Sequence, residues 1–112
     1  MLPKANRLKK KKDFERVFKT GKGFKDNFLF LKLARNNLKI IRFGFVVGKN
    51  FSKKAASRNR IKRRLRGLVK NKLSETKPGF DVVLVVAKGL GIKDFRELAE
   101  TINKLFKKAK LL

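Results

Sequence analysis

The stretch that decides the fold reads Phe80-Asp81-Val82-Val83-Leu84-Val85-Val86-Ala87. A nearly continuous apolar run of this length, introduced by the turn residues Pro78-Gly79, predicts a strand that is buried on both faces of its sheet. Such a strand commonly pairs in parallel with an earlier strand, and a helix that crosses over the sheet connects the two. The residues upstream should therefore hold a strand followed by a helix.

Both elements are present upstream. Residues 40–48 alternate between two sets of side chains, which predicts a strand with Phe43, Phe45 and Val47 on one face. Residues 53–73 then predict a helix, with Ser52 as its N-cap. Its apolar positions follow the spacing i, i+4, i+7, i+8 and are Ile61, Leu65, Leu68 and Val69. Strand, helix and buried strand form one crossover unit, so the sheet is expected to be mixed.

The chain before this unit predicts a basic arm, a short helix and one more strand. Residues 1–12 carry six Lys and Arg and no acid, which indicates a flexible arm that becomes ordered on a phosphate backbone. A helix is expected to begin at Asp13 and to end at Gly21. Residues 24–34 predict a strand, and the turn Asn36-Asn37 would join it to the next strand as a hairpin.

A last helix is expected to start near Asp94 and Glu97, which have the spacing of a capping box. Its core-facing stripe comprises Phe95, Leu98, Ala99, Ile102, Leu105 and Phe106. The elements then run in the order α-β-β-α-β-α. A chain of 112 residues suits one domain, so residues 13–112 are predicted to form a single α+β domain behind the arm.

Composition narrows the classes of function. The chain has 33 Lys and Arg against 8 Asp and Glu, which gives a net charge of +25, and it has neither Cys nor His. Disulfides and thiolate zinc sites are therefore excluded, and the side chain that most often serves as a general base is missing. The carboxylates are scattered, unlike the convergent acids of a metal nuclease. No apolar run is long enough to span a bilayer, so we expect a soluble, cytoplasmic protein without a membrane partner.

The basic residues are concentrated in one part of the chain. Residues 27–74 contain 15 Lys and Arg and no acid. On the predicted helix, Arg58, Lys62 and Arg66 form a ridge beside the apolar stripe. A charge run is often only a solvated face, but a surface that serves stability mixes both signs. Positive charge without internal partners indicates an external polyanion, and the amide of Asn59 suits bases or 2′-hydroxyl groups. We therefore predict that the protein binds RNA or DNA.

The phenylalanines leave two interpretations open. Phe14 and Phe18 lie four residues apart on the first helix, where they either pack in the core or present exposed rings for base stacking. Phe28 and Phe30 carry the same ambiguity, because one face of a sheet can serve as a platform for RNA. The spacing by itself favours the core.

The central helix reads Lys53-Lys54-Ala55-Ala56-Ser57-Arg58-Asn59-Arg60-Ile61-Lys62-Arg63-Arg64-Leu65-Arg66. This string resembles the arginine-asparagine-arginine signature of the bacterial ribonuclease P protein family. The family's first helix is similar to Leu8-Lys9-Lys10 with Asp13-Phe14 and Val17-Phe18-Lys19-Thr20-Gly21. Its second strand is similar to Arg42-Phe43-Gly44-Phe45-Val46-Val47 followed by Lys49, and its third to Gly79-Phe80-Asp81-Val82-Val83. The resemblance covers nearly the whole chain in the right order.

The resemblance implies a ribosomal-protein-like sandwich in which the β-α-β crossover is left-handed. It also implies an enzyme, ribonuclease P, whose catalytic RNA uses magnesium ions to remove the 5′ leader from precursor tRNA. The protein subunit would bind no cofactor or metal alone and would supply no catalytic residue. It would be a monomer in a 1:1 complex with the catalytic RNA and would hold the leader in a cleft between the sheet and the helices.

Carried over by position, the resemblance assigns two sets of residues. Phe14, Phe18 and Lys32 would line the leader cleft; many members carry an aromatic residue where this chain has Lys32, so a phosphate contact is expected there instead of stacking. The RNA-binding set comprises Lys49, Lys53, Lys54, Arg58, Asn59, Arg60, Lys62, Arg63 and Arg66. The alternatives are a ribosomal or ribosome-assembly protein, which would share only the composition, and a nucleoid-type DNA binder, which should show a dimer interface or a base-reading helix.

Overall fold

The structure is a computed structural model that describes residues 2–26, 28–48, 52–86 and 95–112. In these residues the helices are α1 (Lys11–Thr20), α2 (Ala55–Lys70) and α3 (Phe95–Lys108). The strands are β1 (Lys22–Asp26), β2 (Leu29–Arg35), β3 (Arg42–Val47) and β4 (Phe80–Val86). Short 3-10 turns lie at Lys4–Asn6 and Leu73–Glu75.

The four described strands form one sheet in the order β1-β2-β4-β3, so β4 lies inside the sheet although it is the last of them in the chain. β2 pairs antiparallel with β1 and with β4, whereas β3 pairs parallel with β4. Val82, Val83 and Leu84 are fully buried, because β4 has strands on both sides and helices over both faces. The predicted doubly buried strand and the mixed sheet are confirmed.

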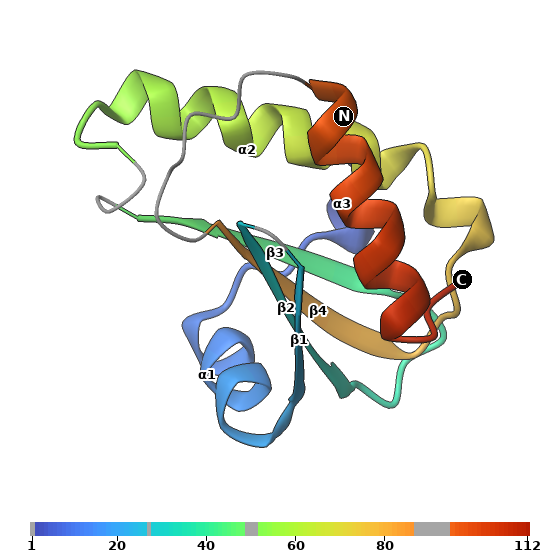
Figure 1. Ribbon diagram of the computed structural model, residues 1–112. Coiled ribbons are helices and arrows are strands. Elements are labelled where there is room, and N and C mark those ends of the chain that lie inside the picture. The colour runs from blue at the N-terminus through green and yellow to red at the C-terminus, as the bar shows by residue number, and fades with distance from the viewer. Residues whose placement is uncertain (1, 27, 49–51, 87–94) are drawn as a thin grey trace.

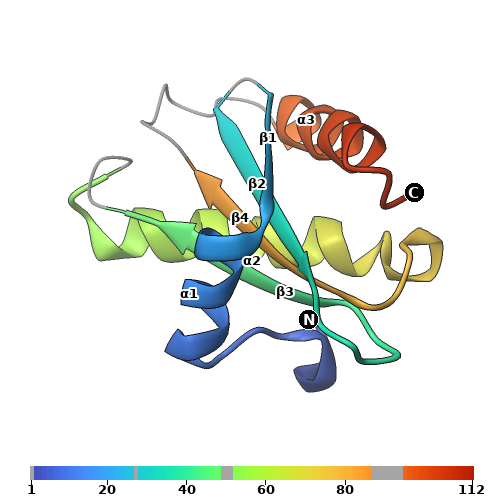
Figure 2. The ribbon, with the colours of Figure 1, turned by 90° about the horizontal axis from the view of Figure 1, so that it is seen from below.

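The crossover from β3 to β4 is made by α2, which lies across one face of the sheet (Figure 1). The two strands point the same way. Seen from the α2 side with their C-terminal ends upward, β4 lies to the left of β3 (Figures 1 and 2). The β3-α2-β4 unit is therefore left-handed, as the resemblance implies, whereas nearly all such crossovers are right-handed.

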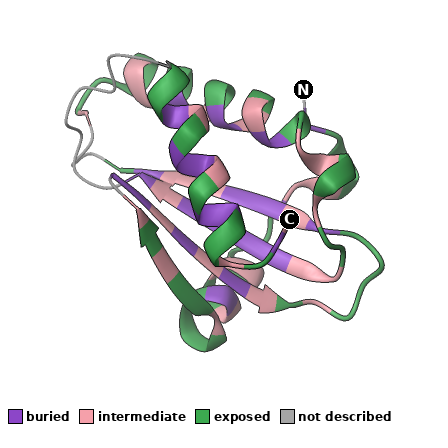
Figure 3. Ribbon diagram, turned by 45° about the vertical axis from the view of Figure 1, so that its right-hand side comes forward, coloured by how far each residue is buried: buried purple, intermediate pink, exposed green. Residues whose placement is uncertain are grey.

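The main core lies between the sheet and the two helices α2 and α3, while α1 covers the opposite face (Figure 1). Buried positions on α2 and α3 face buried positions on the strands (Figure 3). The ring of Phe106 stacks on Phe43 with the centroids 5.8 Å apart. The predicted stripes supply this core through Ile61, Leu65 and Val69 of α2 and through Leu98, Ile102, Leu105 and Phe106 of α3.

A second, smaller core lies between α1 and the other face of the sheet. Its buried members are Leu8, Val17 and Val83, and half-buried side chains such as Phe14 surround them. Val17 is the one residue of α1 that is fully buried. Because burial stabilises by about 25 cal/mol per Å² of apolar surface, apolar packing holds α1 less firmly than it holds α2 or α3.

The strand prediction for the N-terminal half was wrong in two respects. Residues 24–34 form parts of two strands, β1 and β2, which pair with each other. The predicted turn exists, since Leu38 N–H donates to Asn36 Oδ1 at 2.8 Å and Asn37 has a φ of 59°. However, β2 and β3 do not form a hairpin, because β4 lies between them. Local alternation predicts strands but not which strands become neighbours.

The predicted helix boundaries also differ from the observed ones. α1 begins at Lys11, ahead of Asp13, and it ends before Gly21 as predicted. α2 begins at Ala55 without a side-chain cap, because the Oγ of Ser52 accepts from the N–H of Lys54 at 3.2 Å, and Ser52 lies two residues before the N-cap position. The expected capping box at Asp94 lies outside the described residues.

Residues 2–8 of the expected arm pack against the domain in this structure, whereas Lys9 to Lys12 are exposed and α1 begins at Lys11. Leu2 is fully buried in the main core, and Leu8 is buried beside α1. The N–H of Leu8 donates to the carbonyl of Phe43 at 2.8 Å, so the segment follows the outer edge of β3. The charge of the segment indicated an arm, but its two leucines have apolar surface to bury.

None of the described helices combines the length and hydropathy needed to cross a bilayer.

Candidate nucleic-acid interface

The sequence of α2 separates an apolar side from a basic one. Ile61, Leu65 and Val69 face the sheet and are buried. The ridge Arg58, Lys62 and Arg66 is half-buried along the flank of the helix, while the predicted RNA-binding residues Lys53, Lys54, Asn59, Arg60 and Arg63 are exposed. Lys49 lies outside the described residues. The first turn of α2 holds no acid, so its basic side presents positive charge to solvent.

The first arginine of the ridge has a local role. Nη1 of Arg58 donates to the carbonyl of Ser52 at 2.8 Å and ties the segment before α2 to the helix. The guanidinium retains further N–H donors for an external acceptor. A loss of Arg58 would thus affect both the start of the helix and any RNA contact, whereas Arg60 has the simpler environment of an exposed side chain.

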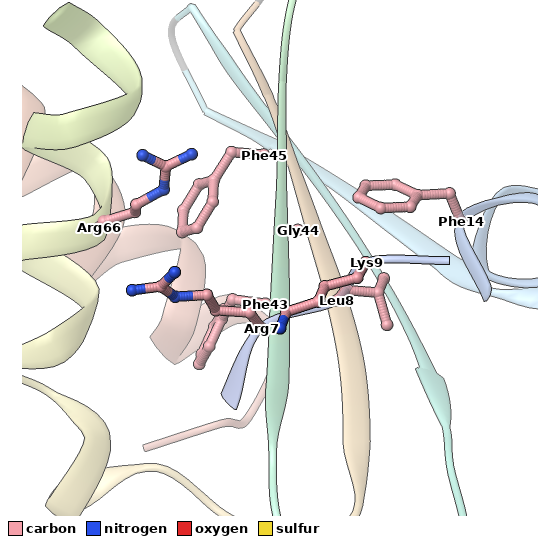
Figure 4. A pocket seen from close by; sticks show the side chains of 8 residues that line it. All are labelled: Arg7, Leu8, Lys9, Phe14, Phe43, Gly44, Phe45 and Arg66. Carbon is pink, nitrogen blue, oxygen red and sulfur yellow. The ribbon is translucent and has the colours of Figure 1, made fainter. Parts of the chain in front are cut away.

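The last arginine of the ridge reaches a hollow of about 260 Å³ at the edge of the sheet. The guanidiniums of Arg66 and Arg7 lie close to each other beside the ring of Phe45, on the α2 side of β3, and Phe14 lies across the strand (Figure 4). The hollow thus brings one predicted RNA-binding residue and one predicted cleft residue together. Its full lining is Arg7, Leu8, Lys9, Phe14, Phe43, Gly44, Phe45 and Arg66.

This lining has the chemistry of a single-strand binding site. It contains Arg7, Lys9 and Arg66 but no acid, so it attracts phosphate groups. The half-buried ring of Phe45 offers an apolar surface beside the two guanidiniums. Sequence reasoning assigned no RNA contact to Phe45, although the alternation that placed it on the face of Phe43 was the available signal.

Phe14 packs against the bare backbone of β3. A Cβ added to Gly44 would lie 2.5 Å from two carbons of the Phe14 ring, so the ring fits only because residue 44 is glycine. Phe14 is half-buried beside Leu8 and Val17. Its environment is that of a core residue with one accessible edge.

Phe18 and Lys32 form a separate pair on the α1 side of the sheet. The side chain of Phe18 is 40% exposed, in contrast to Phe14. Nζ of Lys32 donates to the backbone carbonyl of Phe18 at 2.7 Å. The cation therefore stabilises the C-terminal end of α1, where carbonyls lack partners and the helix dipole is negative. Phe30 lies near Lys32, since a Cβ on Gly23 would meet atoms of both side chains.

A network of charged groups holds α1 near these residues. Asp81 is fully buried and accepts two hydrogen bonds from Arg42, at 2.8 and 2.7 Å, and one from Asn36 at 3.0 Å. Arg16 of α1 donates to the same carboxylate. The hydrogen bonds to Asp81 raise the pKa of Arg42 above its ordinary value. Sequence reasoning missed this network; the signal was one acid within an apolar strand, which needs a buried partner.

Among the described residues, no group of three or more Asp, Glu, His or Cys side chains is arranged to hold a metal ion. The arrangement that is present suits binding rather than proton transfer. Arg7, Lys9 and Arg66 line the hollow together with the half-buried ring of Phe45, and Lys32 binds the backbone carbonyl of Phe18, whose ring is exposed.

The sequence model of the Ribonuclease P family matches residues 2–110 of this chain. The chain belongs to the ribonuclease P protein family. A ribonuclease P protein component from Pseudanabaena sp. is 37% identical over 113 residues, which cover 100% of this chain and 97% of that protein. The corresponding protein of Synechocystis sp. is 39% identical, with 99% of this chain and 90% of that protein covered.

Solved structures of ribonuclease P proteins have the same fold. A Staphylococcus aureus ribonuclease P protein, a mutant with defective mRNA degradation activity, superposes with a TM-score of 0.89 at 25% identity and covers 97% of this chain and 92% of that one. The Thermotoga maritima ribonuclease P protein gives a TM-score of 0.83 at 30% identity, covering 91% and 96%. The resemblance and the α+β fold expected from it are confirmed.

Proposed function

We propose that the chain is the protein subunit of a ribonuclease P holoenzyme, in which it binds the catalytic RNA and the 5′ leader of precursor tRNA. The observation that carries this proposal is the basic side of α2, which holds no acid and runs from exposed Arg60 to Arg66 in the hollow at β3. A surface of this length and sign matches a nucleic-acid backbone rather than a small anion.

The proposed division of labour follows from the residues available. The chain has no His and no Cys, so it is poorly equipped to activate water or to form a covalent intermediate. The RNA subunit would supply hydrolysis together with magnesium ions. The protein would place positive charge between two RNA molecules that repel each other, and it would thereby lower the magnesium concentration at which substrate binds.

The leader is proposed to occupy the α1 side and the β3 edge. The exposed ring of Phe18 supports this placement, because it is available for stacking in the structure as it stands. The hollow beside Arg66 and Phe45 supports a path in which the leader RNA continues from Phe18 toward α2. Lys32 would contact a leader phosphate through the N–H donors that its bond to Phe18 leaves free.

Reconstitution tests the proposal. The purified protein is combined with a bacterial ribonuclease P RNA and precursor tRNA, and cleavage is followed over a series of magnesium concentrations. We expect no cleavage by the protein alone, and cleavage by the RNA at lower magnesium when the protein is present. Specific, metal-dependent cleavage without RNA, or no effect of the protein on the RNA's magnesium requirement, would contradict the proposal.

A further inference from the structure

The helix α1 carries Phe14 and Phe18 but has little apolar surface to hold it in place. Val17 is its one fully buried residue, and the core beneath it is small. The orientation of such a helix depends on its polar contacts. In this structure the strongest of them converge on one buried carboxylate, that of Asp81.

Asp81 lies near the start of β4 on the face that α1 covers. Its pairing partners in the sheet are Ala34 of β2 and Arg42 of β3, so the carboxylate sits at the junction of three strands. Both oxygens are used, because Arg42 binds them as a fork and Asn36 donates to Oδ1. A buried carboxylate with this many donors is fixed in position, so it can serve as a rigid hydrogen-bond acceptor for a neighbouring helix or strand.

Arg16 connects α1 to the carboxylate of Asp81. Its Nη2 donates to Oδ2 of Asp81, and its Nη1 donates to the backbone carbonyl of Arg35 at 2.8 Å. The planar guanidinium thus spans β4 and the end of β2 at once. A weaker link runs from Arg42 to Asp13 of α1, whose closest charged atoms are 3.8 Å apart. These contacts restrict both the rotation of α1 about its axis and its height above the sheet.

Arg16 lies two residues from Phe14 and two from Phe18, so a rotation of α1 about its own axis would move both rings. We propose that the Arg16–Asp81 pair is a positioning device that sets where α1 presents Phe18 to the leader. The proposal rests on the leader-binding role stated above and adds the residues that make the site preorganised. Neither Arg16 nor Asp81 needs to touch RNA in this role.

Arg16→Met is the variant that isolates the effect. It removes the tether from the α1 side and leaves Asp81 paired with Arg42 and Asn36, so the buried acid is not orphaned. Arg16→Lys keeps the charge but loses the fork that spans two acceptors. Lys19→Met is the matched control, because it removes one exposed positive charge from the same helix and does not touch the network.

The measurement is the ratio of holoenzyme affinities for precursor tRNA and for leaderless tRNA. Arg16→Met and Arg16→Lys should both lower this ratio, by roughly 5-fold and up to the roughly 150-fold equivalent of one lost base stack. Lys19→Met should lower the affinity for precursor tRNA and the affinity for leaderless tRNA to a similar extent, so the ratio should stay close to the wild-type value. If Arg16→Lys keeps the wild-type ratio, Arg16 acts as a charge alone and the proposal is wrong.

A double variant separates positioning from general stability. If Arg16 acts through Phe18, then Arg16→Met should lower the ratio little further in a Phe18→Ala background. An undiminished loss in that background would overturn the proposal. If Phe18→Ala itself kept the wild-type ratio, Phe18 would not stack on the leader and this inference would be wrong. The reconstitution experiment would still test the subunit function independently.

Discussion

At the residue scale, Phe14 and Phe18 share one face of α1 but occupy different environments. Phe14 packs on Gly44, where a side chain on the strand would collide with the ring. Phe18, in contrast, remains 40% exposed. Spacing along a helix shows that two residues share a face, but not what the opposing surface offers to each of them. That is why the sequence left core packing and base stacking as open alternatives.

The two rings should therefore respond differently to truncation. Phe18→Ala should weaken binding of precursor tRNA relative to mature tRNA by about 1 to 3 kcal/mol, the value of one stacked base, with a small change in melting temperature. Phe14→Ala should lower the free energy of unfolding by about 3 kcal/mol, because it leaves a cavity against β3. Binding to leaders of increasing length and thermal melting measure the two effects. If Phe18→Ala lowered the affinity for leadered and leaderless tRNA equally, the ring would have a structural role and would not stack on the leader.

The residues that sequence reasoning missed are those whose role depends on a partner far along the chain. Asp81 stands within an apolar run, and its donors come from positions 16, 36 and 42. The need for a partner was predictable from the cost of burying a charge, but its identity was not. Arg7 and Phe45 likewise acquire their place in the hollow only once the edge of β3 exists.

At the element scale, α2 was predicted most completely, because its signals are local. The apolar stripe and the basic side follow from the 3.6-residue period, and both are observed. Its ends were predicted less well, since the cap depends on the backbone before the helix. Gly67 lies in the last turn of α2, is exposed, and has open space where a Cβ would point.

Gly67→Ala should accordingly stabilise the protein. Alanine reduces the conformational freedom of the unfolded chain and has the higher helix propensity, with a gain of up to about 1 kcal/mol. Urea denaturation of the free protein measures the change in the free energy of unfolding. A destabilised variant would contradict the prediction and show that a methyl group at position 67 meets a close neighbour in the folded protein.

The basic side of α2 makes a prediction about salt. Arg60→Ala should reduce the steepness with which holoenzyme affinity falls with the logarithm of salt concentration, by roughly 0.7 to 0.9 for one lost phosphate contact. Its melting temperature should change little, since Arg60 is exposed. Arg58→Ala should affect both quantities because Arg58 also binds the carbonyl of Ser52. A sharp fall in melting temperature for Arg60→Ala with an unchanged salt slope would assign that arginine to the fold.

At the scale of the whole molecule, a net charge of +25 is held within a radius of gyration of 13.0 Å. The class of fold followed from the buried strand and the crossover. The hand of the crossover did not, because physical rules predict a right-handed unit in about 98% of cases. It came from the family resemblance. Which strands lie side by side depends on the complete chain, and local patterns predicted the β2-β3 neighbours wrongly.

This charge should make the free protein sensitive to anions. Sulfate or polyphosphate should raise the melting temperature more than chloride does at the same ionic strength, because anions that bind the folded surface stabilise it by mass action. The gain is about 2.7 kcal/mol at an anion concentration 100 times the dissociation constant. Calorimetry at matched ionic strength separates binding from screening. Identical melting temperatures in all salts would show that screening accounts for the whole effect.

The central place of β4 has a consequence for the order in which the chain folds. The β1-β2 hairpin has both its strands early in synthesis, but β3 has no neighbouring strand until residues 80–86 have left the ribosome. Throughout the synthesis of α2, the nascent chain therefore exposes the inner edge of β2 and the apolar side of the helix together. Pairing between such distant segments is slow. When β4 emerges, it pairs with β2 on one side and with β3 on the other, so one strand completes the whole sheet.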